Sequence, residues 1–252
     1  MDLIHLGSII AAFWITVALM LCHYLSPLII KIKWVNSRRI TSFSGGVAVA
    51  YVFLHMLPSL VEGNQEIGKL LVRTQTLSPL LDLGIFVIAL FGFIIYFGLE
   101  ILATKTKSAE GVASLKVYYL HLFMYAIYNY LITYTMPLRV QTGIFYAIIF
   151  TFAMGLHFIF MDRSFNRNFY QHFSVGGRLF LTLALFLGWL TTYLTNPINT
   201  IAVSFMIAFL AGSILYTVFR EELPASENSS FISFTIGALL ITIILVCLDI
   251  FR

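Results

Sequence analysis

Eight apolar runs, each of about twenty residues, divide this chain and leave only short connections between them. A helix of this length matches the ~30 Å hydrocarbon core of a lipid bilayer. The runs cover residues of about 6–30, 41–61, 80–103, 117–136, 142–161, 175–194, 198–219 and 231–251. Because hydrocarbon offers the backbone no hydrogen-bond partner, each run is predicted to be helical. The chain is therefore expected to be an all-α integral membrane protein, with eight transmembrane helices in a single transmembrane domain over residues 1–252.

The composition leaves little room for a soluble part. Hydrophobic residues make up 60% of the chain and charged residues 10%, whereas soluble domains average roughly 45–50% and 25%. A soluble globular domain is thereby excluded, and no nucleic-acid partner is expected. Cys22 and Cys247 both lie inside apolar runs, so no disulfide framework is expected. The first run is too long for a signal peptide and follows Asp2 and His5 instead of basic residues, so we expect it to be retained as a transmembrane helix.

The basic residues alternate between successive connections. Eleven of the 15 Lys and Arg residues fall in or beside the odd-numbered connections, namely Lys31, Lys33, Arg38, Arg39, Lys105, Lys107, Lys116, Arg163, Arg167, Arg178 and Arg220. Lys69, Arg73, Arg139 and Arg252 fall on the other side. Because cytoplasmic loops are enriched in Lys and Arg, this pattern predicts cytoplasmic odd-numbered connections and extracytoplasmic termini. The short connections favour a bacterial inner membrane.

Two segments of the chain are similar to each other at a spacing of 166 residues. Residues 43–58 read FSGGVAVAYVFLHMLP, and residues 209–224 read FLAGSILYTVFREELP. Six of the sixteen aligned positions are identical, where average residue usage predicts about one or two. The identical pairs are Phe43/Phe209, Gly46/Gly212, Val52/Val218, Phe53/Phe219, Leu57/Leu223 and Pro58/Pro224. The alternative explanation is a coincidence between two apolar segments that both end in Leu-Pro.

The charge pattern gives these two similar segments opposite directions across the membrane. The second helix is expected to run from inside to outside, and the seventh from outside to inside. Inverted repeats of this kind are common in secondary transporters, which bind substrate near the middle of the bilayer. We therefore predict a 3+2+3 arrangement with an inverted repeat, whose halves cover about 1–105 and 170–252. The binding site is expected on the two central helices, at about 115–165.

Polar side chains inside the apolar runs are the candidates for function, because burial in a bilayer is costly for them. Asn129 and His157 lie deep in the two central helices and need partners there. His55 lies near the outer end of the second helix, and Glu221 near the inner end of the seventh. His55 and His121 have an alternative role as neutral histidines capped by backbone carbonyls. The wider set of candidates also includes Ser59, Glu62, Tyr125, Tyr128, Met154, Met161, Arg220 and Glu222.

Two helices carry a family resemblance. The second reads SFSGGVAVAYVFLHMLP, where members of the ZIP family of zinc and iron permeases typically have GGxFLxxxFLHLLPE. The seventh reads AFLAGSILYTVFREELP and resembles the family pattern AGxFLYxxxxExLP. The resemblance covers the whole chain at the level of topology and is specific in these two helices. It implies metal-ion transport instead of enzymatic activity, and it is compatible with a homodimer.

The two central helices depart from the family pattern. Residues 128–133 read YNYLIT where the family has H-N-x-x-D/E-G, so that Asn129 alone matches. In the pattern H-x-x-x-E-G, His157 matches and Met161 replaces the acidic residue, while Asp162 follows one position later, about 100° around a helix. No carboxylate is therefore expected at the middle of the site, and tight Zn²⁺ binding is not expected. The methionines that flank His157 would suit Cu(I) instead.

The leading interpretation is a ZIP-like permease that moves a divalent metal ion, of the zinc or iron class, by alternating access. The resemblance implies a metal site at Asn129 and His157, with His55 near the entrance and Glu221, at the equivalent position of the repeat, near the exit. The expected partners are the bilayer and the transported ion, with no firmly implied cofactor. The second interpretation is a non-transporting ZIP-fold protein with a degraded metal site, which serves as a scaffold or partner-binding protein. The third is an intramembrane metal-dependent hydrolase, which would need about three clustered zinc ligands.

Overall fold

The computed structural model describes residues 3–32, 38–62, 64, 83–109, 111–195, 200–223, 227 and 229–250, and these residues are almost entirely helical and form no strand. The helices are α1 (Leu3–Lys31), α2 (Arg38–Tyr51), α5 (Gly84–Lys105), α6 (Leu115–Tyr134), α7 (Met136–Thr142), α8 (Ile144–Asn168), α9 (Val175–Thr195), α10 (Thr200–Thr217) and α11 (Phe231–Ile250). Two π-helical segments, η1 (Val52–Met56) and η2 (Val218–Glu222), continue α2 and α10. Beyond η1 the second span continues as a helix to Glu62.

Seven of the described helices are long and apolar enough to cross a bilayer, namely α1, α2 with η1, α5, α8, α9, α10 and α11. The remaining predicted span, α6, has 20 residues, which is sufficient for ~30 Å, but its many tyrosines make it less apolar. One side of α6 packs against α9, α5 and α10, and Tyr118 and Tyr128 are buried there, whereas Tyr119 and Phe123 are exposed. The prediction of an all-helical membrane protein is confirmed.

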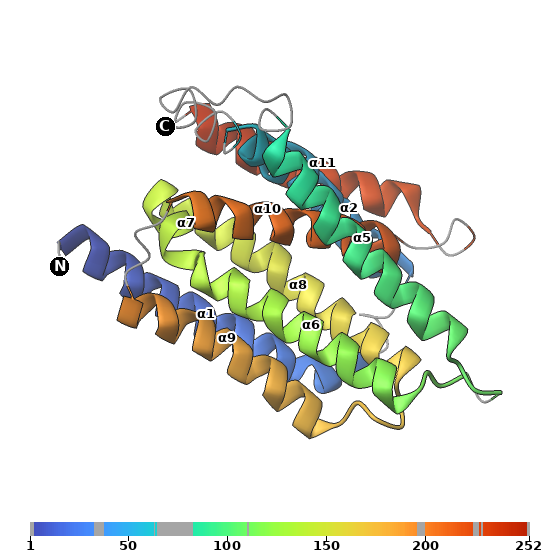
Figure 1. Cartoon of the computed structure of the whole chain (residues 1–252). Coiled ribbons are helices and arrows are strands. Elements are labelled where there is room, and N and C mark those ends of the chain that lie inside the picture. The colour runs from blue at the N-terminus through green and yellow to red at the C-terminus, as the bar shows by residue number, and fades with distance from the viewer. Residues whose placement is uncertain are drawn as a thin grey trace.

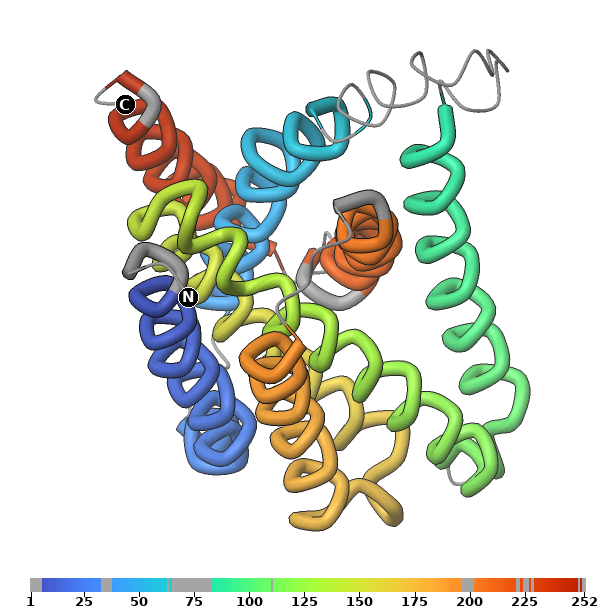
Figure 2. Tube along the Cα trace, turned by 60° about the vertical axis from the view of Figure 1, so that its left-hand side comes forward, coloured from blue at the N-terminus to red at the C-terminus, as the bar shows by residue number. Residues whose placement is uncertain are grey.

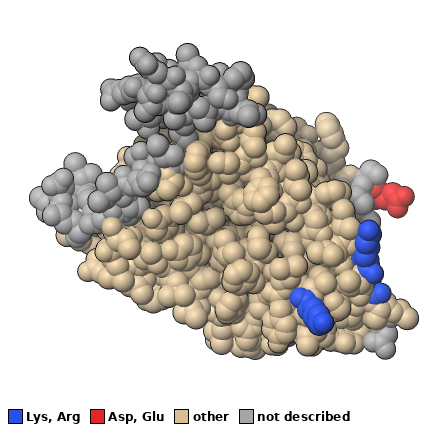
Figure 3. Space-filling view, viewed as in Figure 1, with Lys and Arg blue, Asp and Glu red and all other residues tan. Residues whose placement is uncertain are grey.

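Large apolar side chains cover the outside of the bundle. Trp14, Phe91 and Phe123 are 65%, 58% and 56% exposed. Water would make such a surface prone to association, whereas lipid chains are its natural contact. On the face shown in Figure 3, the visible charged side chains gather toward one end and leave the rest of the described surface uncharged.

The two ends of the bundle differ in charge. α1 begins and α11 ends at the left of Figure 1, which we call the terminal end. The opposite end, which we call the basic end, holds the connections α1–α2, α5–α6, α8–α9 and α10–α11. Two contacts join elements at this end: Lys107 Nζ, just after α5, donates to Asn168 Oδ1 of α8 at 3.0 Å, and Arg220 of η2 pairs with Glu100 of α5 at 3.1 Å. Every described Lys and Arg lies at or near the basic end except Arg139, which belongs to α7.

The helices form two groups of four. In one group, α1 packs against α8 and α9, and α6 packs against α9. In the other, α2 packs along α11, and α5 packs along α10. Figures 1 and 2 both show α1 and α9 side by side, away from α5 and α11. Smaller contacts of α6 with α10 and of α2 with α8 join the two groups.

Glycines allow the backbones of α2 and α11 to touch. A Cβ atom at Gly46 would overlap the carbonyl oxygen of Phe234 on α11. Conversely, a Cβ atom at Gly237 on α11 would overlap the carbonyl oxygen of Phe43 on α2. Small residues at such crossings let helices approach closely, which is how helices associate in membranes without a hydrophobic driving force.

The crossing of α5 and α10 has the same construction. A Cβ atom at Gly212 would overlap the carbonyl oxygen of Ala89, and one at Gly92 would overlap that of Phe209. Gly46 and Gly212 are separated by 166 residues, the spacing of the two similar segments. Phe43 and Phe209, whose carbonyl groups face the glycines of the partner helices, are separated by the same 166 residues. The π-helical segments η1 and η2 also begin 166 residues apart. The two crossings therefore share sequence, spacing and helical irregularity.

Replacement of Gly212 by alanine is expected to separate α5 from α10, because the added methyl group meets backbone atoms that cannot rotate away. We expect a loss of about 3 kcal/mol in stability, seen as a lower melting temperature of the purified protein in detergent. Gly98→Ala, in the partner helix α5, is the matched control, since a Cβ atom there has nothing within 4 Å. Equal losses in both variants would contradict the close crossing.

Candidate functional site

A buried polar network joins α1, α6 and α8. His23 Nδ1 lies 2.9 Å from Asp162 Oδ1, and Nε2 of the same imidazole lies 3.0 Å from Asn129 Nδ2. The Ser26 hydroxyl donates to Asp162 Oδ2, and the Asn129 amide also donates to the Leu181 carbonyl of α9 at 3.3 Å. His23, Ser26, Asn129 and Asp162, which we call the polar network, are each at most 2% exposed. Four helices therefore meet at one hydrogen-bonded group.

Helical geometry places each member of the polar network. His23 and Ser26 are three residues apart on α1 and so share a face. The apolar run of α8 predicts a helix that ends near residue 161, but α8 continues to Asn168. Asp162 therefore lies inside the helix. Six residues separate Asp162 from the end of α8, which corresponds to about 9 Å along the axis. The polar network therefore lies inside the bundle, in the half nearer the basic end.

The hydrogen bonds assign a protonation form to the imidazole. Nε2 accepts a hydrogen bond from the Asn129 amide, so Nδ1 carries the ring proton and donates a hydrogen bond to Asp162. His23 is then neutral, with its ring stacked on Phe158 at 4.5 Å between centroids. Rotation of the Asn129 amide would turn its oxygen toward Nε2 and allow the imidazole a second proton. Both oxygens of Asp162 accept hydrogen bonds, from His23 and Ser26, which is the pattern of a carboxylate acceptor and makes a cation the ligand to test.

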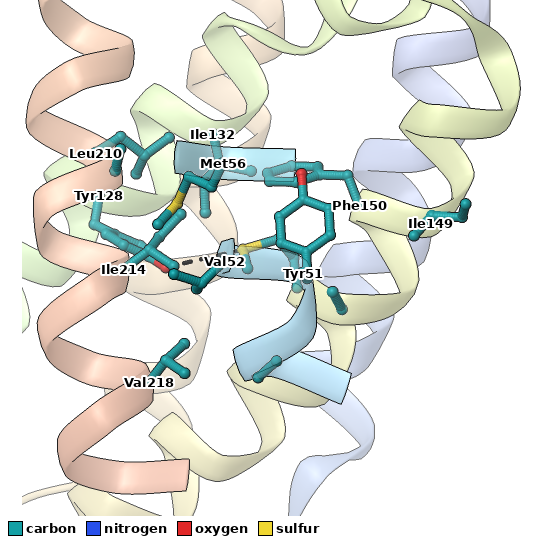
Figure 4. Close-up of a cluster of buried hydrophobic side chains, with 14 of the residues drawn as sticks. Tyr51, Val52, Met56, Tyr128, Ile132, Ile149, Phe150, Leu210, Ile214 and Val218 are labelled. Atoms are coloured by element: carbon teal, nitrogen blue, oxygen red, sulfur yellow. Dashed lines mark hydrogen bonds between the residues drawn. The ribbon is translucent and has the colours of Figure 1, made fainter. Parts of the chain in front are cut away.

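Asn129 and His157, the two predicted central ligands, face different partners. Asn129 points toward His23 on α1, whereas the fully buried His157 lies against Tyr128, with 5.7 Å between the ring centroids. The Tyr128 hydroxyl lies 3.9 Å from Met154 Sδ, the contact that is dashed in Figure 4. The region between α6 and α8 therefore contains two distinct environments, the polar network and an aromatic and sulfur-containing contact around His157.

His55 lies in η1 and lines a cavity of about 190 Å³ at the terminal end. Its ring stacks on that of Tyr146, with 5.5 Å between centroids and 12° between planes. Ser59 and Glu62 line the same cavity, in agreement with the shared helix face that their spacing predicts. Arg139 of α7 also lines it. A wider depression of about 350 Å³ adjoins this cavity and shares His55, Ser59 and Glu62.

The remaining candidates lie elsewhere. Glu221 belongs to η2, but its side chain is outside those that the structure describes. The adjacent Arg220 pairs with Glu100 at the basic end. His121 is buried, and its Nδ1 lies 3.0 Å from the Val117 carbonyl oxygen. This is the contact expected of a histidine capped by the backbone.

The polar network is the best candidate for holding a cation. Within the described ranges, no three His, Cys, Asp or Glu side chains come together in a metal-binding group. The network instead offers the His23 imidazole and the Asp162 carboxylate beside the neutral oxygens of Ser26 and Asn129. Zinc in structural sites takes four ligands, commonly Cys and His, and one carboxylate balances half the charge of a divalent ion. This ligand set favours weak binding of a divalent ion over tight binding.

Most of the polar network escapes prediction from the sequence. His23 and Ser26 lie in the first apolar run, outside the two central helices, and Asp162 is displaced by one residue from the family pattern. This shift of one residue does not turn Asp162 out of the bundle, because Asp162 hydrogen-bonds to His23 of α1 and not to a residue of α6. A histidine and a serine three residues apart inside an apolar run are the signal that points to this face of α1.

Comparisons of the chain with protein-family models, curated proteins and solved structures found no match.

Asp162→Ala is expected to destabilise the protein strongly, because it leaves the His23 imidazole buried without its acceptor. Loss of one partner from a buried hydrogen bond leaves the other group unsatisfied and costs about 1–3 kcal/mol, which thermal unfolding in detergent would detect. Glu100→Ala is the matched control, since it removes a carboxylate that pairs with the half-exposed Arg220 and should cost less than about 1 kcal/mol. Similar, small losses in both variants would show that the network contributes little to stability.

Proposed function

We propose that this protein is a ZIP-like secondary transporter, an inverted-repeat permease that moves a divalent metal ion of the zinc or iron class. One observation carries the proposal: the α2–α11 and α5–α10 crossings are built alike, at the spacing that relates the sequences of α2 and α10. Inverted repeats are common in secondary transporters, where the substrate site lies between the repeats.

The directions and pairings of the helices support the inversion. α2 begins at the basic end, where Ser42 accepts a hydrogen bond from the Ser230 amide next to the start of α11. α10 ends at the same end, beside Arg220. The equivalent helices α2 and α10 therefore run in opposite directions. The packing of α1 on α8 likewise corresponds to that of α9 on α6, as expected for a two-fold axis in the membrane plane.

The path that we propose for the ion follows α8 from end to end. Phe150 lines the cavity at the terminal end, His157 follows seven residues later, and Asp162 follows after five more. At 1.5 Å per residue these steps are about 10 Å and 8 Å. In this proposal the basic end faces the cytoplasm, in a bacterial inner membrane. His55 then lies at the extracytoplasmic entrance, and Glu221 at the exit.

The grouping of the helices suggests how access could alternate. All members of the polar network belong to α1, α6 and α8, which are in one group of four, and none belongs to α2, α5, α10 or α11. Movement of the first group against the second would expose the network to one end and then to the other. The smaller contacts between the groups would be broken and remade, while the close glycine crossings would stay intact.

A non-transporting protein of the same fold is the second candidate, and one observation favours it. Each oxygen of Asp162 already has a donor, from His23 and from Ser26. A carboxylate satisfied in this way can serve as a structural clamp between α1 and α8 without ever binding an ion. Transport and structural roles make different predictions for a variant that keeps the shape of this side chain and removes its charge.

Liposomes that contain the purified protein are expected to take up at least one of Zn²⁺, Fe²⁺, Mn²⁺ and Cu⁺ faster than empty liposomes. Asp162→Asn should lower this flux by about tenfold or more, because the ion loses the one negative charge of the polar network while the side chain keeps its size. Glu100→Gln makes the same chemical change in an exposed pair and should leave the flux unchanged. Size-exclusion profiles and melting temperatures would show that all variants are folded before reconstitution.

The outcomes separate the candidates. Absence of flux for every ion would contradict the permease and favour the non-transporting protein. Flux that is unaffected by both Asp162→Asn and His157→Ala would leave the transport function and exclude the proposed path.

A further inference from the structure

The cavity at the terminal end narrows toward the centre of the bundle. Its outer chamber, of about 190 Å³, is lined by His55, Glu62 and Arg139 among others. A narrow extension of about 10 Å³ continues inward past Tyr51, Arg139 and Phe150. A space of this size holds about one water-sized atom. The outer chamber is therefore large enough for a small molecule, and the floor has room for one atom of that molecule.

Two buried hydrogen-bond donors at this floor have no hydrogen-bond partner among the described residues. They are the Tyr51 hydroxyl and the Arg139 Nε–H. The Tyr51 side chain is 2% exposed, and Figure 4 shows its ring beside Phe150, with the hydroxyl oxygen at the end that reaches the level of Phe150. Burial of polar groups without partners is costly. A ligand that accepts both hydrogen bonds would remove this cost.

The floor of the cavity is positively charged. The Arg139 guanidinium lies 4.2 Å from the centroid of the Phe150 ring, which holds it in position. The lining of the narrow extension includes no acidic side chain in the described part of the chain. Glu62 lies in the outer chamber, is exposed, and forms no ion pair with Arg139 in the described structure. The floor therefore favours an anion.

We propose that the floor of this cavity binds a small oxyanion, a carboxylate or phosphate group. One oxygen of the anion accepts hydrogen bonds from the Tyr51 hydroxyl and the Arg139 Nε–H, and the rest of the ligand occupies the outer chamber. Charge-assisted hydrogen bonds from arginine to such groups are short and strong. The chamber wall presents further polar side chains to the remainder of the ligand, namely His55, Ser59, Glu62, Thr142, Tyr146 and Ser204. The site uses no member of the polar network and does not depend on the proposed transport of a metal ion.

The test is a titration of the purified protein in detergent with inorganic phosphate, acetate and chloride at constant ionic strength, followed by calorimetry and thermal unfolding. Phosphate or acetate is expected to stabilise the protein saturably, and chloride is not. Tyr51→Phe deletes a hydroxyl that has no hydrogen-bond partner among the described residues, so the stability without anion should not fall while the anion affinity falls about tenfold or more. Arg139→Gln should abolish saturable binding.

Tyr96→Phe is the matched control. Tyr96 is as buried as Tyr51, at 1% exposed, but its hydroxyl donates to the Met124 carbonyl at 2.8 Å. This variant should lose stability and keep the wild-type anion affinity, which is the reverse of the result for Tyr51→Phe. Weaker phosphate binding in phosphatidylglycerol nanodiscs than in nanodiscs of a phosphate-free glycolipid would identify a lipid headgroup as the source of the oxyanion.

Three results would overturn the proposal. They are the absence of saturable binding by phosphate and acetate, an equal effect of chloride, and an anion affinity that is unchanged in both Tyr51→Phe and Arg139→Gln.

Discussion

The hydrogen bonds that His23 and Ser26 donate to Asp162 allow a carboxylate to lie inside a membrane protein, and the packing of α1 on α8 depends on them. Hydrocarbon supplies no donor, so the protein must provide one for every buried acceptor. The same requirement acts between α6 and α9, where the Thr133 hydroxyl donates to the Leu185 carbonyl at 2.7 Å. Every apolar face of these helices could contact lipid, so apolar contact alone does not favour one arrangement of the helices over another. The internal hydrogen bonds and the close backbone crossings do select one.

Apolarity predicts the helices well where they face lipid and less well where they face protein. The runs give the number and approximate bounds of the long helices, because lipid contact demands a continuous apolar sequence. α8 extends to Asn168, several residues past its apolar run, because its last turns are buried against other helices and tolerate Asp162 and Ser164. The short helix α7 is not predicted at all, since seven residues with a proline and an arginine resemble a connection. It is this connection that brings Arg139 into the cavity.

The similarity of residues 43–58 and 209–224 points to the two central helices, which hold Asn129 and Asp162, but not to α1, which holds His23 and Ser26. The similarity around Gly46 and Gly212 is explained by two helix crossings that require a residue without a side chain. Asn129 is correctly identified as a buried polar residue of a central helix, yet its partner is His23, which is more than a hundred residues away in the chain. Contacts between distant spans leave no periodic pattern in either one. For this reason the partners of a buried polar residue were harder to predict than its burial.

The π-helical segments have a consequence for the history of the chain. A π turn holds one residue more than the α-helical turn that it replaces, so it is equivalent to a single inserted residue. η1 and η2 lie at corresponding places in two helices, and separate origins would require the same insertion twice. If the two halves descend from one duplicated segment, the insertion preceded the duplication and both copies kept it. The side chains did not stay alike, since His55 in one copy corresponds to Glu221 in the other. If the halves arose in this way, the π-helical turn is older than the side chains, His55 and Glu221, that now occupy it.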